Sequence, residues 1–302
     1  MITLGASAWG TLGVFATTLY EAGLDPIDVA AARVTVAWIG FAVIAVIFKP
    51  ENIRLTPRQR ALLALHGLIA VALYNLLYFG AIAQVGIALA VALLYSAPAW
   101  SAVLGYLLLR ERHPARVYVA VPLTVMGVAL AVTNPAGFSL SVPTAGLLLG
   151  LGAALAYALF SILGKLLLRD CASSTMLLYS FGTGSFILTA VAWLDGGGDR
   201  LISMGPGDWL VLLAAGVFPT FLAYLAYTEG LRRIPASLAT LLAATEPVVA
   251  VALGLVVTGE RLSVYQFSGV VLVLAAAAIG AICRQEANRA AASSATSRRG
   301  KS

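Results

Sequence analysis

The stretch LAATEPVVAVALGLVVTGE, residues 242–260, is an apolar run interrupted by one carboxylate, Glu246, and by the proline that follows it. A similar run, LYSAPAWSAVLGYLLLRE, occupies residues 94–111. Both belong to longer segments, 78–112 and 227–261, which align without a gap at an offset of 149 residues. Leucines and alanines match easily in apolar sequence, but the segments also share Tyr78 with Tyr227, Pro98 with Pro247, Gly105 with Gly254, and Glu111-Arg112 with Glu260-Arg261. The pattern indicates an internal duplication.

Composition fixes the environment of the chain. Of its 302 residues 61% are hydrophobic and 11% charged, against about 25% charged in a typical soluble domain. The apolar residues come in blocks of about 20, the length a helix needs to cross a bilayer, where backbone groups must pair internally. We therefore predict an all-α polytopic membrane protein with ten transmembrane helices, over residues 2–20, 27–48, 60–84, 87–110, 115–133, 143–167, 174–194, 208–231, 236–258 and 263–283. The break near Gln84–Gly86 rests only on the length of the apolar stretch around it.

Lysine and arginine predict the orientation. With the N-terminus in the cytoplasm, most basic residues fall in cytoplasmic loops or the tail, and only Arg200 and Arg261 lie outside. The positive-inside rule then predicts a multi-pass protein of the inner (plasma) membrane with both termini cytoplasmic. The net charge of +6 follows from this topology, so we expect the lipid bilayer as a partner and no nucleic acid. Residues 285–302 are interpreted as a basic disordered cytoplasmic tail.

The duplication also predicts a mechanism. Each copy holds five predicted helices, an odd number, so the two copies are inserted upside down relative to each other. We predict a first repeat over residues 1–134, a linker over 135–142 and a second repeat over 143–284. Inverted repeats can open a central cavity to one side of the membrane and then to the other, and matched broken helices point to that site. Pro98 and Pro247 are the predicted hinge or kink positions, although each kink could simply be filled by neighbouring side chains.

The ten spans, the five-plus-five duplication, the P…G…ER ending of the fourth span in each half and the arginine in AAARVTVAW together resemble the drug/metabolite transporter superfamily, EamA-type. Within that superfamily the chain is most similar to the YddG-type exporters. The resemblance implies export of aromatic amino acids or some cationic compounds. It also implies a fold in which the first four spans of each half surround a central cavity and the fifth lies outside.

Glu246 is the sharpest candidate for contact with a substrate. An ionised carboxylate at the bilayer centre costs about 2.5–3.5 kcal/mol on insertion scales, so it needs a wet cavity, a cationic partner or a proton. We interpret it as a contact to a substrate ammonium or as a proton-coupling group; the alternative is a neutral, hydrogen-bonded glutamate that only packs. Its repeat partner is Ala97, and helical phase then predicts Trp100 on the same face.

Further polar and aromatic residues lie within the predicted spans. We expect the cavity to be lined by Trp9, Tyr74, Asn75, Tyr78, Tyr95, Tyr157 and Tyr224 in addition to Glu246 and Trp100. Such rings suit a flat substrate through stacking or cation–π contact, although packing between helices would also satisfy them. Arg33 could hold a substrate carboxylate or pair with Glu21, Asp25 or Asp28. His66 is a possible proton-linked group or a hydrogen-bonded core histidine.

The leading hypothesis is a secondary transporter that exports amino acids, aromatic or bulky hydrophobic, by alternating access. The alternative is a broad-specificity exporter of drugs or cationic metabolites. No phosphate-binding loop G-x-x-x-x-G-K-[ST] is present, which argues against an ATP-driven pump. No intramembrane catalytic pattern is visible, so we expect no enzyme, cofactor or metal. A monomer is expected, because the duplication completes the core within one chain.

Overall fold

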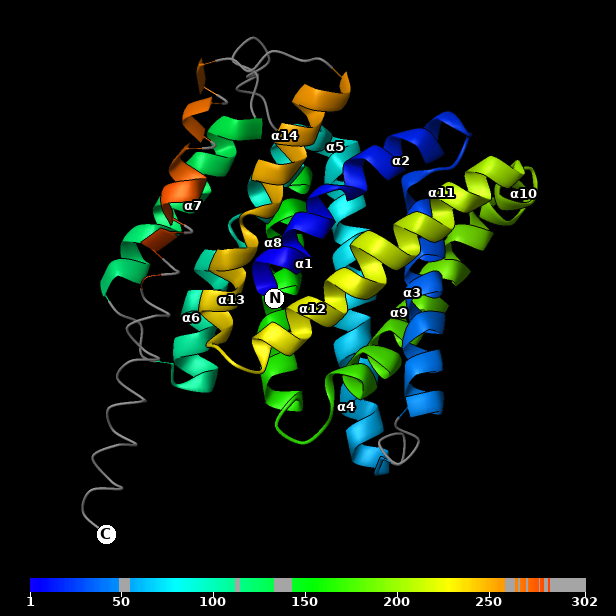
Figure 1. The fold of residues 1–302 in the computed structure, drawn as a ribbon, viewed down its shortest axis with the longest axis horizontal. Helices are drawn as coiled ribbons and strands as arrows, with labels where there is room; N and C mark the ends of the chain where they lie inside the picture. Colours follow the sequence, from blue (N-terminus) through cyan, green and yellow to red (C-terminus); the bar gives the residue numbers. More distant parts are fainter. Residues whose placement is uncertain are drawn as a thin grey trace.

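The computed structural model describes residues 1–48, 55–111, 115–132 and 143–258 together with most of 264–282. Within these residues the regular structure is helical (Figure 1). The first half contains α1 (Ile2–Gly10), α2 (Leu12–Glu21), α3 (Pro26–Phe48), α4 (Pro57–Gly67), η2 (Leu68–Leu73), α5 (Tyr74–Leu94), α6 (Ala97–Leu109) and α7 (Ala115–Val132). The second half contains α8 (Thr144–Leu167), α9 (Ser173–Leu194), α10 (Gly197–Ile202), α11 (Pro206–Gly216), η4 (Val217–Leu222), α12 (Ala223–Leu231), α13 (Ala236–Ala243) and α14 (Glu246–Thr258). The predicted linker and tail, and Glu260-Arg261, lie outside the described residues.

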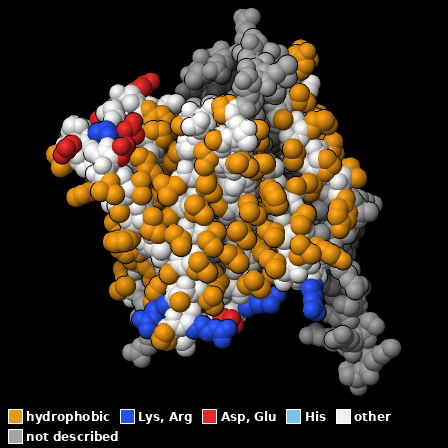
Figure 2. All heavy atoms as spheres, turned by 180° about the vertical axis from the view of Figure 1, so that it is seen from behind, with side chains coloured by type: hydrophobic (Ala, Val, Ile, Leu, Met, Phe, Trp, Pro, Cys, Tyr) orange, Lys and Arg blue, Asp and Glu red, His pale blue; other side chains and the backbone are white. Residues whose placement is uncertain are grey.

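The helices have the length and composition of a multi-pass membrane protein. Among the described residues, six helical stretches are long and apolar enough to span a bilayer: 2–21, 26–47, 57–85, 144–167, 173–194 and 206–231. Four shorter apolar helices cover 97–109, 118–127, 236–250 and 267–276. Figure 2 shows apolar side chains over the middle of one face, with lysines and arginines at one end and an acidic group at the other. An apolar belt between charged ends is the surface that a bilayer requires.

Contacts with α8 show how α5 runs. The α5 backbone is helical from Tyr74 to Leu94, so there is no loop at the predicted break near Gln84–Gly86. Along α8, however, Gly152 lies against Leu77, Gly146 against Gln84 and Val85, and Gly150 against Leu93. The order reverses after Val85, so the chain turns back along α8 through a sharp bend. Close approach at these positions is possible because glycine has no Cβ.

Helix boundaries recur at the offset seen in the sequence. Shifting α4, η2 and α6 by 149 residues reproduces the bounds of α11, η4 and α14. The two π-helices, η2 and η4, each pack on helices from the other half of the chain: η2 on α8 and α9, and η4 on α1 and α3. Pro219 lies inside η4 and removes a backbone donor there, whereas η2 contains no proline. The π-helix therefore recurs at the matched position, although only one of the two copies contains a proline.

Pro98 and Pro247 lie at helix starts. The chain is interrupted at Tyr95–Ser96 and again at Ala244–Thr245, and each proline is the second residue of the helix that follows. In the first turn of a helix the missing N–H of proline is not needed. These prolines thus begin new helices, α6 and α14, where the sequence predicted kinks within continuous spans. The two interruptions are neighbours, since Tyr95 and Ala244 share one apolar cluster.

Candidate functional site

Glu246 lies in the first turn of α14, inside the bundle. A helix begins with unpaired N–H groups and a partial positive charge, so this position favours a carboxylate. That is the physical reason for a glutamate directly before the proline. The side chain is partly exposed, and the hydroxyl of Tyr95, at the matched interruption, donates a hydrogen bond to its carboxylate. The carboxylate is therefore held in position by Tyr95.

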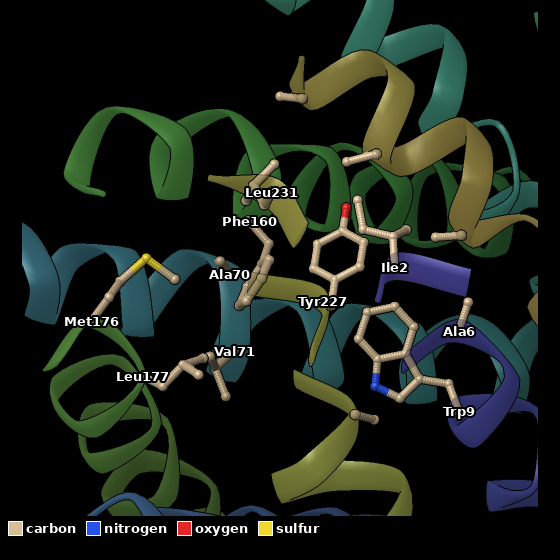
Figure 3. Packing of buried hydrophobic residues seen from close by; sticks show 14 of the residues in the cluster. Ile2, Ala6, Trp9, Ala70, Val71, Phe160, Met176, Leu177, Tyr227 and Leu231 are labelled. Atoms are coloured by element: carbon tan, nitrogen blue, oxygen red, sulfur yellow. The ribbon is translucent and has the colours of Figure 1, made fainter. Parts of the chain in front are cut away.

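Seven aromatic side chains from both halves of the chain form one group, here called the ring cluster. It comprises Trp9 from α1, Tyr74 and Tyr78 from α5, Tyr157 and Phe160 from α8, and Tyr224 and Tyr227 from α12. Trp9 is central, with ring centroids 4.9 Å from Tyr224, 5.0 Å from Tyr227 and 6.3 Å from Tyr157. Figure 3 shows Trp9 beside Tyr227, and Phe160 on the other side of Tyr227.

Two buried polar atoms in the ring cluster, the Trp9 indole Nε1 and the Tyr157 hydroxyl, have no hydrogen-bond partner among the described residues. In Figure 3 the Trp9 nitrogen faces away from the Tyr227 hydroxyl, which instead is 2.6 Å from the Ser161 hydroxyl. An unpaired buried polar group costs about 1–3 kcal/mol. Atoms of this kind are available to a bound molecule that carries an acceptor.

Arg33 reaches the same region from α3. Its Nη2 donates to Asn75 Oδ1 at 3.0 Å, and Asn75 follows Tyr74 of the ring cluster. Two of the three acidic residues expected as structural partners are engaged elsewhere, because Arg200 lies 2.6 Å from Asp28 and 3.2 Å from Asp25. The backbone carbonyl of Glu246 lies against Gly10, which directly follows Trp9 of the ring cluster. Opposite charges therefore lie near the same group of rings.

The structure does not bring Trp100 into this group. Ala97, the repeat partner of Glu246, is buried, but Trp100 is 36% exposed. It shares an outward face with Val103 and Leu107, which are also exposed. Helical spacing alone put Trp100 with Ala97, and the packing of α6 against α8 and α13 decided otherwise. We leave Trp100 out of the proposed site.

His66 is placed as a connecting side chain between helices. It is 1% exposed, with Nδ1 2.8 Å from the Ser180 hydroxyl and Nε2 3.1 Å from the Phe160 carbonyl. Because a carbonyl only accepts, Nε2 carries the hydrogen and Ser180 donates to Nδ1 in the neutral form. A second proton would require the Ser180 hydroxyl to turn to the Leu63 carbonyl, 3.4 Å away. His66 thus contacts the ring cluster through Phe160 but lies behind it.

The expected lining did not include Phe160 and Tyr227, and binding of a substrate carboxylate by Arg33 was only one of two alternatives. All three were visible as polar or aromatic residues within predicted spans, but nothing in the sequence showed that they converge. Among the described residues no group of three or more His, Cys, Asp or Glu side chains could hold a metal ion.

Comparison with known proteins gives the family to which this helical membrane protein belongs. The model of the EamA-like transporter family matches residues 1–133 and 144–281, so the chain belongs to this family. The family and its members described below are transporters rather than enzymes.

Three relatives and one solved structure define the similarity. An uncharacterized transporter of Archaeoglobus fulgidus is 29% identical over 91% of this chain and 92% of its own length. The uncharacterized transporter YwfM of Bacillus subtilis is 26% identical over 90% of each chain. The threonine/homoserine exporter RhtA of Salmonella typhimurium is 27% identical over 79% of this chain and 77% of its own. A crystal structure with a TM-score of 0.78 covers 94% of this chain and 96% of that one; at 18% identity it shows the fold alone.

Proposed function

We propose that this protein is a secondary transporter of the inner membrane that exports amino acids, aromatic or bulky hydrophobic, by alternating access. The observation that carries the proposal is the place of Glu246. It is a half-buried glutamate at the start of a helix that begins within the bundle, with its backbone against Gly10, the neighbour of Trp9 in the ring cluster. Such a carboxylate suits a substrate ammonium, and the rings suit an apolar side chain.

Alternating access draws support from the recurrence of helix bounds at an offset of 149 residues. We infer that the two halves form inverted repeats, in which broken helices at matched positions flank a central site. Basic residues near the cytoplasmic ends of the predicted spans, such as Arg58, Lys165 and Arg233, would place both termini in the cytoplasm. The direction of transport would then be outward from a cytoplasm-facing site.

Amino acids as substrates draw further support from two observations. The unpartnered Trp9 N–H and Tyr157 hydroxyl could serve a polar substrate group. The threonine/homoserine exporter RhtA, a relative at 27% identity, is by its name an amino-acid exporter. Threonine and homoserine are smaller than the substrates proposed here. We propose a larger, aromatic or bulky substrate side chain because seven rings form the cluster.

Proteoliposomes containing the purified protein test the proposal. We expect saturable uptake of labelled phenylalanine, competition by tryptophan, and faster uptake when unlabelled phenylalanine is preloaded inside. Counterflow of this kind requires a carrier that alternates between two sides and is absent from a channel. Uptake should be measured with and without a pH gradient, and empty liposomes serve as the control. Absence of saturable uptake under both conditions would overturn amino-acid export.

The second candidate is export of flat organic cations. It is favoured by the combination of the ring cluster with the Glu246 carboxylate. These groups suit a flat cation, which has no carboxylate and therefore needs no cationic residue in the site. Uptake of an aromatic amine with no competition from phenylalanine would support it over the first candidate.

A further inference from the structure

Arg33 is a buried cation that the described ion pairs leave without a carboxylate in direct contact. Its exposed fraction is 7%, and the hydrogen bond of its guanidinium goes to a neutral amide, Asn75. A buried charge with incomplete pairing is costly in a protein, and more so within a bilayer. Of the five N–H donors on a guanidinium, this bond uses one. The guanidinium of Arg33 therefore has N–H donors with which to bind an anion.

Asn75 holds the guanidinium in one orientation. Its Nδ2 donates to the Val71 carbonyl at 2.7 Å, one turn earlier in η2, which directs Oδ1 towards Arg33. Asn75 is itself 2% exposed, so the pair is fixed on both sides. A planar fork held in place in this way matches the geometry of a carboxylate, which accepts two parallel N–H bonds.

The pair lies beside the ring cluster and opposite in charge to Glu246. Asn75 is next to Tyr74, whose ring is 6.0 Å from Tyr78 and 5.9 Å from Tyr157. Arg33 and Asn75 come from the first half of the chain and Glu246 comes from the second. Glu246 lies with its backbone against Gly10, next to Trp9, so a molecule against the rings has a cation from one half and an anion from the other beside the same ring cluster.

We propose that Arg33, oriented by Asn75, binds the carboxylate of a zwitterionic α-amino acid whose ammonium is bound by Glu246. The inference rests on the proposed function and narrows it to a substrate class. In the empty protein the two charges partly compensate each other. A zwitterion satisfies both and adds no net charge to the interior of the membrane. An amine alone satisfies Glu246 but leaves Arg33 without an anion, and an acid alone does the reverse.

Binding by the full-length protein in nanodiscs tests this pairing. The ligands are phenylalanine, phenethylamine, which lacks the carboxylate, and 3-phenylpropionate, which lacks the ammonium. We expect the wild type to bind phenylalanine at least about tenfold more tightly than either analogue, since losing a charge-assisted pair costs about 1.5–3 kcal/mol. Arg33→Gln should lower the affinity for phenylalanine to that for phenethylamine and leave the affinity for phenethylamine unchanged. The affinity of Arg33→Lys for phenylalanine should lie between those of the wild type and Arg33→Gln, because lysine keeps the positive charge and lacks the planar guanidinium.

Arg58→Gln is the matched control, because Arg58 is exposed at the start of α4 and should change none of the affinities. Equal binding of phenylalanine and phenethylamine by the wild type would overturn the carboxylate subsite while leaving export of aromatic amines intact. An equal loss of both ligands in Arg33→Gln would assign Arg33 a packing role and overturn it as well. Binding of none of the three ligands would overturn the proposed function together with the subsite. If Arg33→Gln fails to fold, Arg33→Lys replaces it: an affinity for phenylalanine equal to that of the wild type would overturn binding of the carboxylate by the guanidinium of Arg33.

Discussion

Two regions of the molecule, α4–η2–α5–α6 and α11–η4–α12–α13–α14, share a backbone and differ in chemistry. Their matched helix bounds and π-helices recur at an offset of 149 residues. One helix differs: α5 is continuous, whereas the matched residues form α12 and α13 with a break between them. Side chains at matched positions also differ: Glu246 corresponds to Ala97, Asn75 to Tyr224, and His66 to Ala215. The comparison teaches that most of the scaffold is repeated while the polar groups near the rings occur once. Changes to the scaffold should therefore affect folding, and changes to the unmatched polar groups should affect transport.

The largest effect is expected at Glu246, the charge that the first half lacks. Glu246→Gln keeps an acceptor for the Tyr95 hydroxyl and removes the charge offered to an ammonium. We expect phenylalanine transport to fall at least about 100-fold, the loss of a charge pair worth roughly 3 kcal/mol, with an unchanged thermal midpoint. Glu229→Gln is the control, because Glu229 is 3.8 Å from Arg232 at a helix end. Normal flux in Glu246→Gln would remove this carboxylate from the site.

Gly67 and Gly216 test the shared scaffold at matched positions, each directly before a π-helix. A Cβ at Gly67 would collide with the backbone carbonyl of Ser180, whereas at Gly216 it would meet the side chain of Val36. Overpacking typically costs about 1–3 kcal/mol, less where a side chain can move. Gly67→Ala should lower the thermal midpoint clearly more than Gly216→Ala, measured by unfolding in detergent. The opposite order would mean that α9 adapts more easily than α3.

His66 tests whether an unmatched polar group is structural. His66→Ala removes the side-chain partner of the Phe160 carbonyl and leaves the Ser180 hydroxyl only the longer bond to the Leu63 carbonyl, at a cost of about 1–3 kcal/mol. We expect lower thermal stability and an unchanged response of transport to a pH gradient. Proton linkage is then assigned to Glu246, and the same gradient experiment on Glu246→Gln is the comparison. Loss of the gradient response in His66→Ala alone would assign proton linkage to the histidine.

The smallest effect is expected at Tyr78 and Tyr227. These tyrosines occupy matched positions in the two halves but have different partners. Tyr227→Phe removes a hydrogen bond to Ser161 and should cost about 0.5–1.5 kcal/mol of stability. Tyr78 is partly exposed and stacks on Tyr74, so Tyr78→Phe should leave stability within about 0.5 kcal/mol. Thermal unfolding of both variants measures the difference. Equal losses would show that the two tyrosines play the same structural part.

Local patterns in the sequence account for much of the fold. Apolar blocks of about 20 residues predicted spans in six places where the structure has long apolar helices. The repeat predicted matched interruptions, and the helix breaks before Pro98 and Pro247 lie where the two copies align. The sequence did not predict that α5 bends without leaving the helical state, because no glycine–proline signal distinguishes that bend from a loop.

The candidate site was predicted only in part, and the reason is helical phase. Trp100 was assigned to the face of Ala97 by spacing within one helix, but the packing of α6 against α8 and α13 buries Ala97 and leaves Trp100 exposed. Arg33 had acidic residues nearby in the sequence, yet Asp25 and Asp28 are drawn to Arg200, far along the chain. Spacing along one segment cannot predict competition of this kind.

The amino-acid sequence by itself determined that this chain is a helical membrane protein with an internal repeat, because hydropathy and repetition are properties of the chain read in order. The tertiary structure alone decided which rings meet Trp9, which polar atoms stay unpartnered, and that Arg33 turns to Asn75. Those facts depend on the rotation and depth of helices from different halves. Packing between distant segments sets both, and no local pattern encodes them.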